Sequence, residues 1–222
     1  MGRRMFAQHQ SQLMMTGSLE GEETMNRPQL ILDVAGVIAT NLSPGFWEEA
    51  AAKAGSTTYR QLKDSFTREI RESFWTGGIT IEQFRDWLAG HGPDLSMERL
   101  SALAMKYLQP LPALGRIATW SRDADIHLLS NHREEWLSGL LAPVKEQVKS
   151  LTISSRAGYC KPDPRIYQLV CEQIGDGGGP RIYVDDQEKN LIPARALGWH
   201  TVIADPEGCW MEEVSQLLKQ QR

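Results

Sequence analysis

The chain has 222 residues, of which 41% are hydrophobic and 23% charged, and its formal net charge is −4. These values are ordinary for a globular protein with a sizeable core, organised as one domain or as a core with a smaller insertion. Lysine and arginine are scattered rather than clustered, which argues against a nucleic-acid-binding surface. No apolar run approaches the roughly 18 residues of a transmembrane helix, so we expect no membrane span.

The three cysteines form no C-x-x-C pair and are odd in number. We therefore expect no disulfide framework and no zinc site, and a reducing, cytoplasmic setting. Residues 1–28 are polar and lack an apolar h-region, which predicts a loosely ordered extension rather than a signal peptide. Met25 is a candidate natural start, and a docked N-terminal helix is the alternative.

The first strand is predicted by the short aliphatic run that begins at Leu30, because it has no helical spacing. Asp33 follows at the point where this strand must stop and turn. In open α/β sheets, ligands bind at the carboxyl ends of the strands. Taken alone, Asp33 is more simply explained as a residue that caps a turn.

Residues 42–109 have no strand character and predict a helical bundle inserted after the first strand. Apolar residues at i, i+4 spacing indicate one helix from Thr58 to Phe74. Thr80 and Ser96 are predicted to cap two further helices, and a helix over residues 46–53 precedes them. Trp47, Trp75 and Trp87 of this region are expected in the core, with a pocket-facing ring as the alternative.

From Pro112 onward, helices and strands are predicted to alternate. The expected strands are 125–130, 151–154, 181–186 and 200–204, and the expected helices are 113–121, 133–141, 164–174, 190–197 and 207–220. This alternation predicts right-handed βαβ units and a parallel sheet. The predicted fold class is therefore α/β, with a Rossmann-like parallel-sheet core at residues 29–41 and 110–222 and an inserted helical-bundle cap at residues 42–109.

Polar side chains follow four of the predicted strands, and a parallel sheet brings such ends to one edge. They are Asp33, Ser130, Lys161 and the pair Asp185-Asp186. A carboxylate such as Asp33 can form an aspartyl-phosphate. Ser130 and the backbone N–H of Asn131, at a predicted helix start, can hold phosphate oxygens. Lys161 can stabilise the transferring group, and the three aspartates supply the hard oxygen ligands that Mg²⁺ requires.

Four motifs in this order resemble the haloacid dehalogenase-like (HAD) hydrolase superfamily. They are Asp33-Val34-Ala35-Gly36-Val37, Leu129-Ser130-Asn131, Lys161-Pro162-Asp163-Pro164 and Val184-Asp185-Asp186. Gly77-Gly78-Ile79-Thr80 with Glu82-Gln83-Phe84 resembles the cap of the sugar-phosphate phosphatase-like branch, which is related to the N-terminal domain of soluble epoxide hydrolases.

The resemblance implies a Mg²⁺-dependent phosphatase of a small phosphorylated metabolite. Asp33 would attack phosphorus, and water would hydrolyse the aspartyl-phosphate. It also implies that Asp33, the backbone carbonyl of Ala35 and Asp186 bind Mg²⁺, with Asp185 assisting directly or through water. The sequence does not name the substrate or the oligomeric state.

One departure from the family pattern concerns acid/base catalysis. The family usually has a second Asp two residues after the nucleophile, and this chain has Ala35 there. Acid/base help is worth about 10²–10⁴-fold, so we expect slow hydrolysis. His132 could contact substrate or donate a proton instead, although a solvent-facing residue is the simpler interpretation. Arg133 and Glu134 are expected to be surface charges at a helix start.

Four alternatives remain open. A non-catalytic HAD-fold binding or regulatory module is one. A phosphonoacetaldehyde hydrolase-like enzyme would need a cap lysine, for which Lys53 or Lys63 could be proposed. A dehalogenase is disfavoured by the intact Asp185-Asp186 pair, and a phosphotransferase by the missing acid/base residue. A cap that presents His, Lys or Arg toward Asp33 would favour an enzyme, and an apolar plug would favour a module.

Overall fold

A computed structural model describes residues 27–53, 57–176 and 178–221. The predicted extension therefore lies almost wholly outside the described residues, as does Met25. Five parallel strands form one sheet in the order β3-β2-β1-β4-β5. The strands are β1 (Gln29–Leu32), β2 (Asp125–Ser130), β3 (Val148–Ile153), β4 (Arg181–Asp185) and β5 (His200–Ile203). The α/β fold class with a parallel sheet is thus confirmed.

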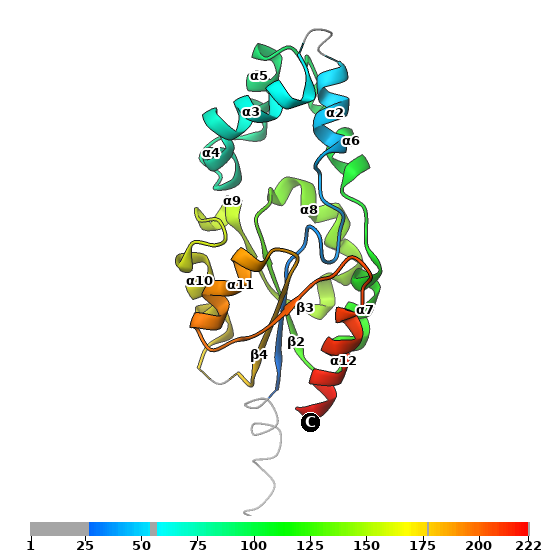
Figure 1. Ribbon diagram of the computed structural model, residues 1–222, viewed down its shortest axis with the longest axis vertical. Coiled ribbons are helices and arrows are strands. Elements are labelled where there is room, and N and C mark those ends of the chain that lie inside the picture. The colour runs from blue at the N-terminus through cyan, green and yellow to red at the C-terminus, as the bar shows by residue number, and fades with distance from the viewer. Residues whose placement is uncertain (1–26, 54–56, 177, 222) are drawn as a thin grey trace, which may run out of the picture.

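Helices cover both faces of the sheet (Figure 1). The alternation of side chains along β1 explains this arrangement, since successive residues point to opposite faces. Leu30 and Leu32 belong to a buried cluster with α7 (Pro112–Trp120), α8 (Glu134–Leu141) and α12 (Trp210–Gln220). Ile31 belongs to a second cluster with α10 (Pro164–Ile174) and α11 (Glu188–Ala196). Because both faces are covered, the central strands are continuous apolar runs.

Five helices lie between β1 and α7 in the sequence. They are α2 (Gly45–Ala52), α3 (Tyr59–Glu69), α4 (Arg71–Trp75), α5 (Ile81–Gly90) and α6 (Met97–Tyr107). Figure 1 shows them together at one end of the molecule, above α8 and α9 (Ser154–Ala157). Their apolar side chains join the same buried cluster as those of α7 and α8. The domain boundaries at residues 41 and 110 stay a prediction.

Local sequence signals explain where several of these helices begin. The Thr58 and Thr80 side chains each accept a hydrogen bond from the backbone N–H three residues later, and a glutamine at that position bonds back in both cases. Ser96 caps α6 through its hydroxyl. Thr80 and Ser96 are the capping residues that the sequence indicated, whereas the cap at Thr58 and the glutamine partners were not predicted. All three caps satisfy N–H groups that have no partner inside the helix.

The single helix predicted from Thr58 to Phe74 is wrong. The chain leaves α-helical geometry at Ile70, with φ −136°, and continues as the separate short helix α4. The turn redirects Phe74 and Trp75 toward the core, where their carbonyls accept hydrogen bonds from Arg133 and Ser154. The regular i, i+4 spacing does not reveal this, because the partners come from distant parts of the chain.

Two short elements were not predicted: α9 and the 3₁₀ helix Ala142–Gln147. The third strand also begins three residues earlier than expected. It lies at the edge of the sheet, and its first residues are partly exposed, so their side chains lack a continuous apolar signal. Within the described ranges, every helix is too short or too polar to cross a membrane.

Candidate active site

A buried lysine joins two carboxylates at the carboxyl ends of neighbouring strands. Asp33 follows β1 directly, and Asp185 is the last residue of β4, which pairs with β1. Lys161, from the loop before α10, places Nζ 2.8 Å from Asp33 Oδ1 and 2.7 Å from Asp185 Oδ2. All three residues are at most 4% exposed. The structure therefore brings together residues that are up to 152 positions apart in the sequence, as the strand-end argument expected.

The side-chain amide of Asn131 fixes the lysine loop. Its Oδ1 accepts a hydrogen bond from the Lys161 backbone N–H at 2.7 Å, and its Nδ2 donates to the Lys161 carbonyl at 2.9 Å. Lys161 Nζ also donates to the carbonyl of Leu129 at 3.1 Å. The Asn131 side chain is thus a positioning group, and Asn131 lies three residues before α8 rather than at the helix start itself.

Asp185 is held by donors on both carboxylate oxygens. Oδ2 accepts from Lys161 and from the Tyr183 hydroxyl, and Oδ1 accepts from the Gln187 backbone N–H and from Asn190 Nδ2. These four hydrogen bonds use the lone pairs that a directly bound cation would need. Asn190 thus steadies the acidic loop, and no pattern in the sequence indicates the Tyr183 contact.

Three other oxygens at this edge remain available. Among the described residues, Asp186 Oδ1 and Ser130 Oγ are buried without a hydrogen-bond partner. Asp33 Oδ1 is occupied by Lys161 and by the Val34 backbone N–H, at 2.8 Å and 2.6 Å, but no contact is assigned to its other oxygen. Carboxylate oxygens of Asp33, Asp185 and Asp186 lie within 4.8 Å of one another. The cluster therefore combines positioned donors with unsatisfied oxygens.

Burial and the neighbouring charges together shift the pKa values of the three aspartates. Burial raises the pKa of Asp33 to about 8, against the lowering effect of Lys161 and with further raising by Asp185. Burial, followed by the neighbouring Asp185, also raises the pKa of Asp186. Burial would raise the pKa of Asp185 too, but Lys161 and the other donors outweigh it and lower that pKa. If all three aspartates are ionised, Lys161 leaves two negative charges uncompensated, which a divalent cation would balance.

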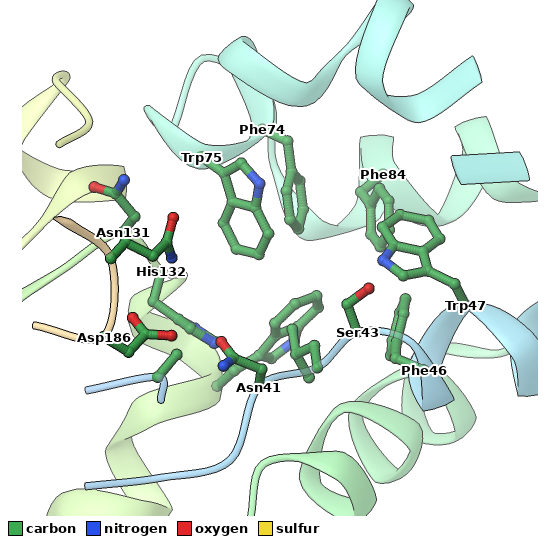
Figure 2. Close-up of a pocket in the computed structure, with 14 residues that line it drawn as sticks. Asn41, Ser43, Phe46, Trp47, Phe74, Trp75, Phe84, Asn131, His132 and Asp186 are labelled. Carbon is green, nitrogen blue, oxygen red and sulfur yellow. The ribbon is translucent and has the colours of Figure 1, made fainter. Parts of the chain in front are cut away.

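A cavity of about 390 Å³ reaches this cluster at Asp186, whereas Asp33, Lys161 and Asp185 lie behind its lining residues. Figure 2 shows Asn131, His132 and Asp186 at one end and Phe46, Trp47 and Phe84 at the other. Phe74 and Trp75 form a further wall, and Trp136 of α8 lies among the rings. The remaining lining residues are Ala35, Asn41, Leu42, Ser43 and Gln187. Trp47 and Trp75 thus face the cavity, whereas Trp87 does not line it.

The predictions for two residues after the Ser130 motif are wrong. His132 is only 2% exposed rather than solvent-facing, and burial lowers its pKa to about 4. Arg133 is 4% exposed rather than a surface charge. Its Nη1 donates to the carbonyls of Phe74 and Ile79, at 2.9 Å each. The insertion packs over this segment, and a reading of the local sequence cannot detect that. Glu134 is exposed, as expected, and pairs with Arg156 at 3.3 Å.

The inserted helices present neither a basic residue nor an apolar plug to the cavity. Lys53 is exposed. Lys63 Nζ donates to Ser43 Oγ at 3.0 Å and to the Tyr59 hydroxyl at 3.2 Å, and it does not line the cavity. The side chains that these helices contribute are aromatic rings around open space.

Comparisons with known proteins support the family resemblance at the level of the fold. No protein-family model matches the chain. It is 21% identical to D-ribitol-5-phosphate phosphatase of Bacteroides thetaiotaomicron over 204 residues, which cover 85% of this chain and 97% of that protein. It is 35% identical to mouse acyl-CoA dehydrogenase family member 10 over 74 residues, and 24% identical to rat bifunctional epoxide hydrolase 2 over 98 residues. These matches cover 33% and 44% of the chain but only 7% and 16% of the two mammalian proteins.

Solved structures share the architecture over most of the chain. A predicted HAD-like family hydrolase from Porphyromonas gingivalis matches with a TM-score of 0.73 and 20% identity, over 88% of this chain and 98% of that one. A HAD family enzyme from Bacteroides thetaiotaomicron, in complex with magnesium and inorganic phosphate, matches with a TM-score of 0.68 and 22% identity, over 81% and 95%. The chain therefore has the HAD fold, as its four motifs predicted.

Proposed function

We propose that this protein is a Mg²⁺-dependent phosphatase that hydrolyses a small phosphorylated metabolite through an aspartyl-phosphate on Asp33. The observation that carries the proposal is the buried Lys161 bridge between Asp33 and Asp185, beside the unsatisfied oxygens of Asp186 and Ser130. A purely structural ion pair would not need these unpartnered oxygens beside a cavity that Asp186 lines. Strongly perturbed, clustered titratable groups of this kind are typical of functional sites.

In the first step, a carboxylate oxygen of Asp33 attacks phosphorus, and the bond from phosphorus to the ester oxygen breaks. The leaving group departs with the bonding electron pair and takes a proton from solvent. In the second step, water attacks phosphorus, releases inorganic phosphate and restores the Asp33 carboxylate. Lys161 stabilises the negative charge of the transferring group. The Ser130 hydroxyl and the Asn131 backbone N–H bind phosphate oxygens.

The donor set fits Mg²⁺, which prefers oxygen ligands and few protein carboxylates. Asp33, Asp186 and the backbone carbonyl of Ala35 would hold the ion, which supplies positive charge for the phosphate oxygens and the nucleophile. Asp185 would act through water and through Lys161, because its own lone pairs are occupied. Gly36 supports this arrangement, since its backbone packs against the Asp186 carboxylate with no room for a side chain.

Acid/base assistance is the weak part of this site. Ala35 lines the cavity where the family usually has a second aspartate. The buried His132 is neutral near pH 7, because its pKa is lowered to about 4. Its Nδ1 lies 3.3 Å from the Arg133 carbonyl, so the tautomer with a proton on Nδ1 leaves Nε2 as an acceptor. His132 would therefore accept a proton from water more readily than donate one to the leaving group.

The comparisons are consistent with this reaction. One relative that aligns over most of both chains is a D-ribitol-5-phosphate phosphatase, and one structural neighbour binds magnesium and inorganic phosphate. We also propose that residues 42–109 form a cap that covers the site, with the core at residues 29–41 and 110–222.

The test is phosphate release from a panel of phosphate monoesters, with Mg²⁺ and with EDTA. The wild type is compared with Asp33→Asn and with the control Asp64→Asn, which changes an exposed carboxylate of α3. We expect metal-dependent turnover in the wild type and in Asp64→Asn, and its loss in Asp33→Asn. Equal inactivity of all three proteins, while each is folded and the wild type binds Mg²⁺ by calorimetry, would refute the phosphatase proposal and favour a binding module.

A further inference from the structure

We infer that the substrate of this site carries a flat aromatic ring system in its leaving group. The inference rests on the proposed function and deepens it. If the phosphate group binds at the carboxylate end of the cavity, the inference describes the rest of the substrate, which is the leaving group. Polyol and sugar phosphates are the contrasting class.

The cavity is polar at one end and aromatic at the other. Asp186 and Asn131 lie at the polar end, and Phe46, Trp47 and Phe84 lie at the opposite end (Figure 2). Its volume of about 390 Å³ falls within the range of about 300–1,000 Å³ that is typical of small-molecule sites. A molecule bound with its phosphate at the polar end would therefore extend its leaving group among the rings.

Charge is absent from the aromatic end. Of the described residues that line the cavity, only Asp186 and His132 have titratable side chains, and both lie at the polar end. Besides indole N–H groups, the polar side chains near the rings are Asn41 and Ser43. The Ser43 hydroxyl already accepts a hydrogen bond from Lys63. A polyol chain would bury several hydroxyl groups with few partners, and each unpaired group would weaken binding by about tenfold or more.

The rings are held by their own packing rather than collapsed into the space. Trp75 packs on Phe74 with ring centroids 4.7 Å apart and lies 5.6 Å from the His132 ring. Its carbonyl accepts a hydrogen bond from the Ser154 hydroxyl at 2.6 Å. Trp47 packs on Phe66 at 4.6 Å. Walls of this kind offer faces and edges on which another aromatic ring can stack in an offset or edge-to-face manner.

A linear alkyl group would also bury apolar surface here, but it would not gain the ring–ring geometry. It would also lose more rotational freedom than a rigid bicyclic ring on entering a fixed cavity. The shape and rigidity of the walls therefore favour the flat ring over the chain.

The experiment compares three phosphate esters that all release a primary alcohol: 2-naphthylmethyl phosphate, n-nonyl phosphate and ribitol 5-phosphate. Matching the leaving-group chemistry prevents intrinsic lability from imitating recognition. We expect kcat/KM for the naphthylmethyl ester to exceed that for the ribitol ester by about 100-fold and that for the nonyl ester by about tenfold. A ribitol ester turned over as well as the naphthylmethyl ester would overturn the inference and leave the phosphatase proposal intact.

Two variants test whether the rings cause the preference. Trp75→Leu keeps an apolar side chain but removes the flat ring from the cavity wall. Trp87→Leu removes a ring of similar size from α5 that does not line the cavity. We expect Trp75→Leu to raise KM for the naphthylmethyl ester about tenfold with little change for the ribitol ester. Trp87→Leu should change KM for neither ester. Equal losses on both esters in Trp75→Leu would overturn the inference.

A binding measurement separates this inference from the reaction. Asp33→Asn protein, which cannot form the aspartyl-phosphate, is titrated with 2-naphthylmethanol and with ribitol while tryptophan fluorescence is recorded. Saturable binding of the naphthyl alcohol alone supports the aromatic site even if no ester is hydrolysed, in which case the phosphatase proposal fails by itself. Binding of neither alcohol, or of ribitol alone, would overturn the inference.

Discussion

Replacement of Arg133 by methionine should weaken the attachment of the α4–α5 turn to the core. The guanidinium carries two hydrogen bonds at 2.9 Å to the carbonyls of Phe74 and Ile79, which frame the turn between α4 and α5. It also lies 5.2 Å from the centroid of the Phe74 ring. Methionine preserves much of the apolar stem but donates no hydrogen bond, so both carbonyls lose their Arg133 partner.

The magnitude follows from these contacts. A hydrogen bond from a charged donor contributes about 1.5–3 kcal/mol, so the loss of two gives about 2–5 kcal/mol, since Ile79 is partly solvated and the Phe74 carbonyl still accepts from the Gly77 N–H. The same packing region holds Gly77, whose φ of +79° and close approach to the Ser155 carbonyl leave no room for a side chain. Because both contacts join the same loop to the core, we expect the loss to appear as local opening as well as lower global stability.

Denaturant unfolding measures the loss of global stability, and amide hydrogen exchange of residues 71–80 measures the local opening. Arg156→Met is the matched control: its side chain is 61% exposed and pairs with an exposed glutamate, so the change in the free energy of unfolding should stay below about 0.5 kcal/mol. An Arg133→Met protein within 0.5 kcal/mol of the wild type, with unchanged exchange over residues 71–80, would refute this reasoning.

Three further predictions concern the site and the core. Gly36→Ala should weaken Mg²⁺ binding by about 10–100-fold, measured by calorimetry, because a Cβ at φ +89° would overlap the Asp186 carboxylate. Gly90→Ala is the control, since its added Cβ meets nothing within 4 Å. Equal Mg²⁺ affinities of the two variants would contradict the role of Asp186 as a ligand. Burial lowers the pKa of His127 from 6.5 to about 4, so the unfolded chain binds more protons between these values and stability falls as pH falls through that window. His127 should contribute about 3 kcal/mol to the loss of stability between pH 7 and pH 4, measured by chemical denaturation as the difference between the wild type and His127→Gln, and an unchanged pH dependence in that variant would refute the assignment. Ala35→Asp should raise kcat on esters of unactivated alcohols at least about tenfold by supplying an acid/base group, and no gain in a protein that still binds Mg²⁺ would argue against this role for the position.

Much of the fold could be predicted because its signals are local. The runs around Leu30, Ile126 and Ile182 are short and apolar since these strands are buried on both faces, and the sequence between them shows helical spacing and capping residues. The order of these elements implies a parallel sheet, and a parallel sheet places Asp33, Ser130 and Asp185 at one edge. The Asp33–Lys161–Asp185 cluster follows from that topology.

Other features depend on contacts between distant segments. The break at Ile70 arises because Phe74 and Trp75 bond to Arg133 and Ser154, and no residue near Ile70 indicates it. Arg133 was expected on the surface because an arginine at a helix start is ordinarily solvated. The strand predicted at residues 151–154 misses the first three residues of β3. These residues are only partly buried at the edge of the sheet, so they carry no continuous apolar signal.

The sequence alone determined the α/β class, the alternation of strands and helices along the chain and the group of polar residues at the strand ends. Each depends on a pattern within a few residues or on a fixed property of parallel sheets. Only the tertiary structure decided which oxygens are free and what surrounds them. The four donors on Asp185, the unpartnered Asp186 Oδ1 and the aromatic walls of the cavity are set by how the insertion packs on the core. Hydrogen-bond saturation and cavity shape depend on positions in space, which residue spacing along the chain does not specify.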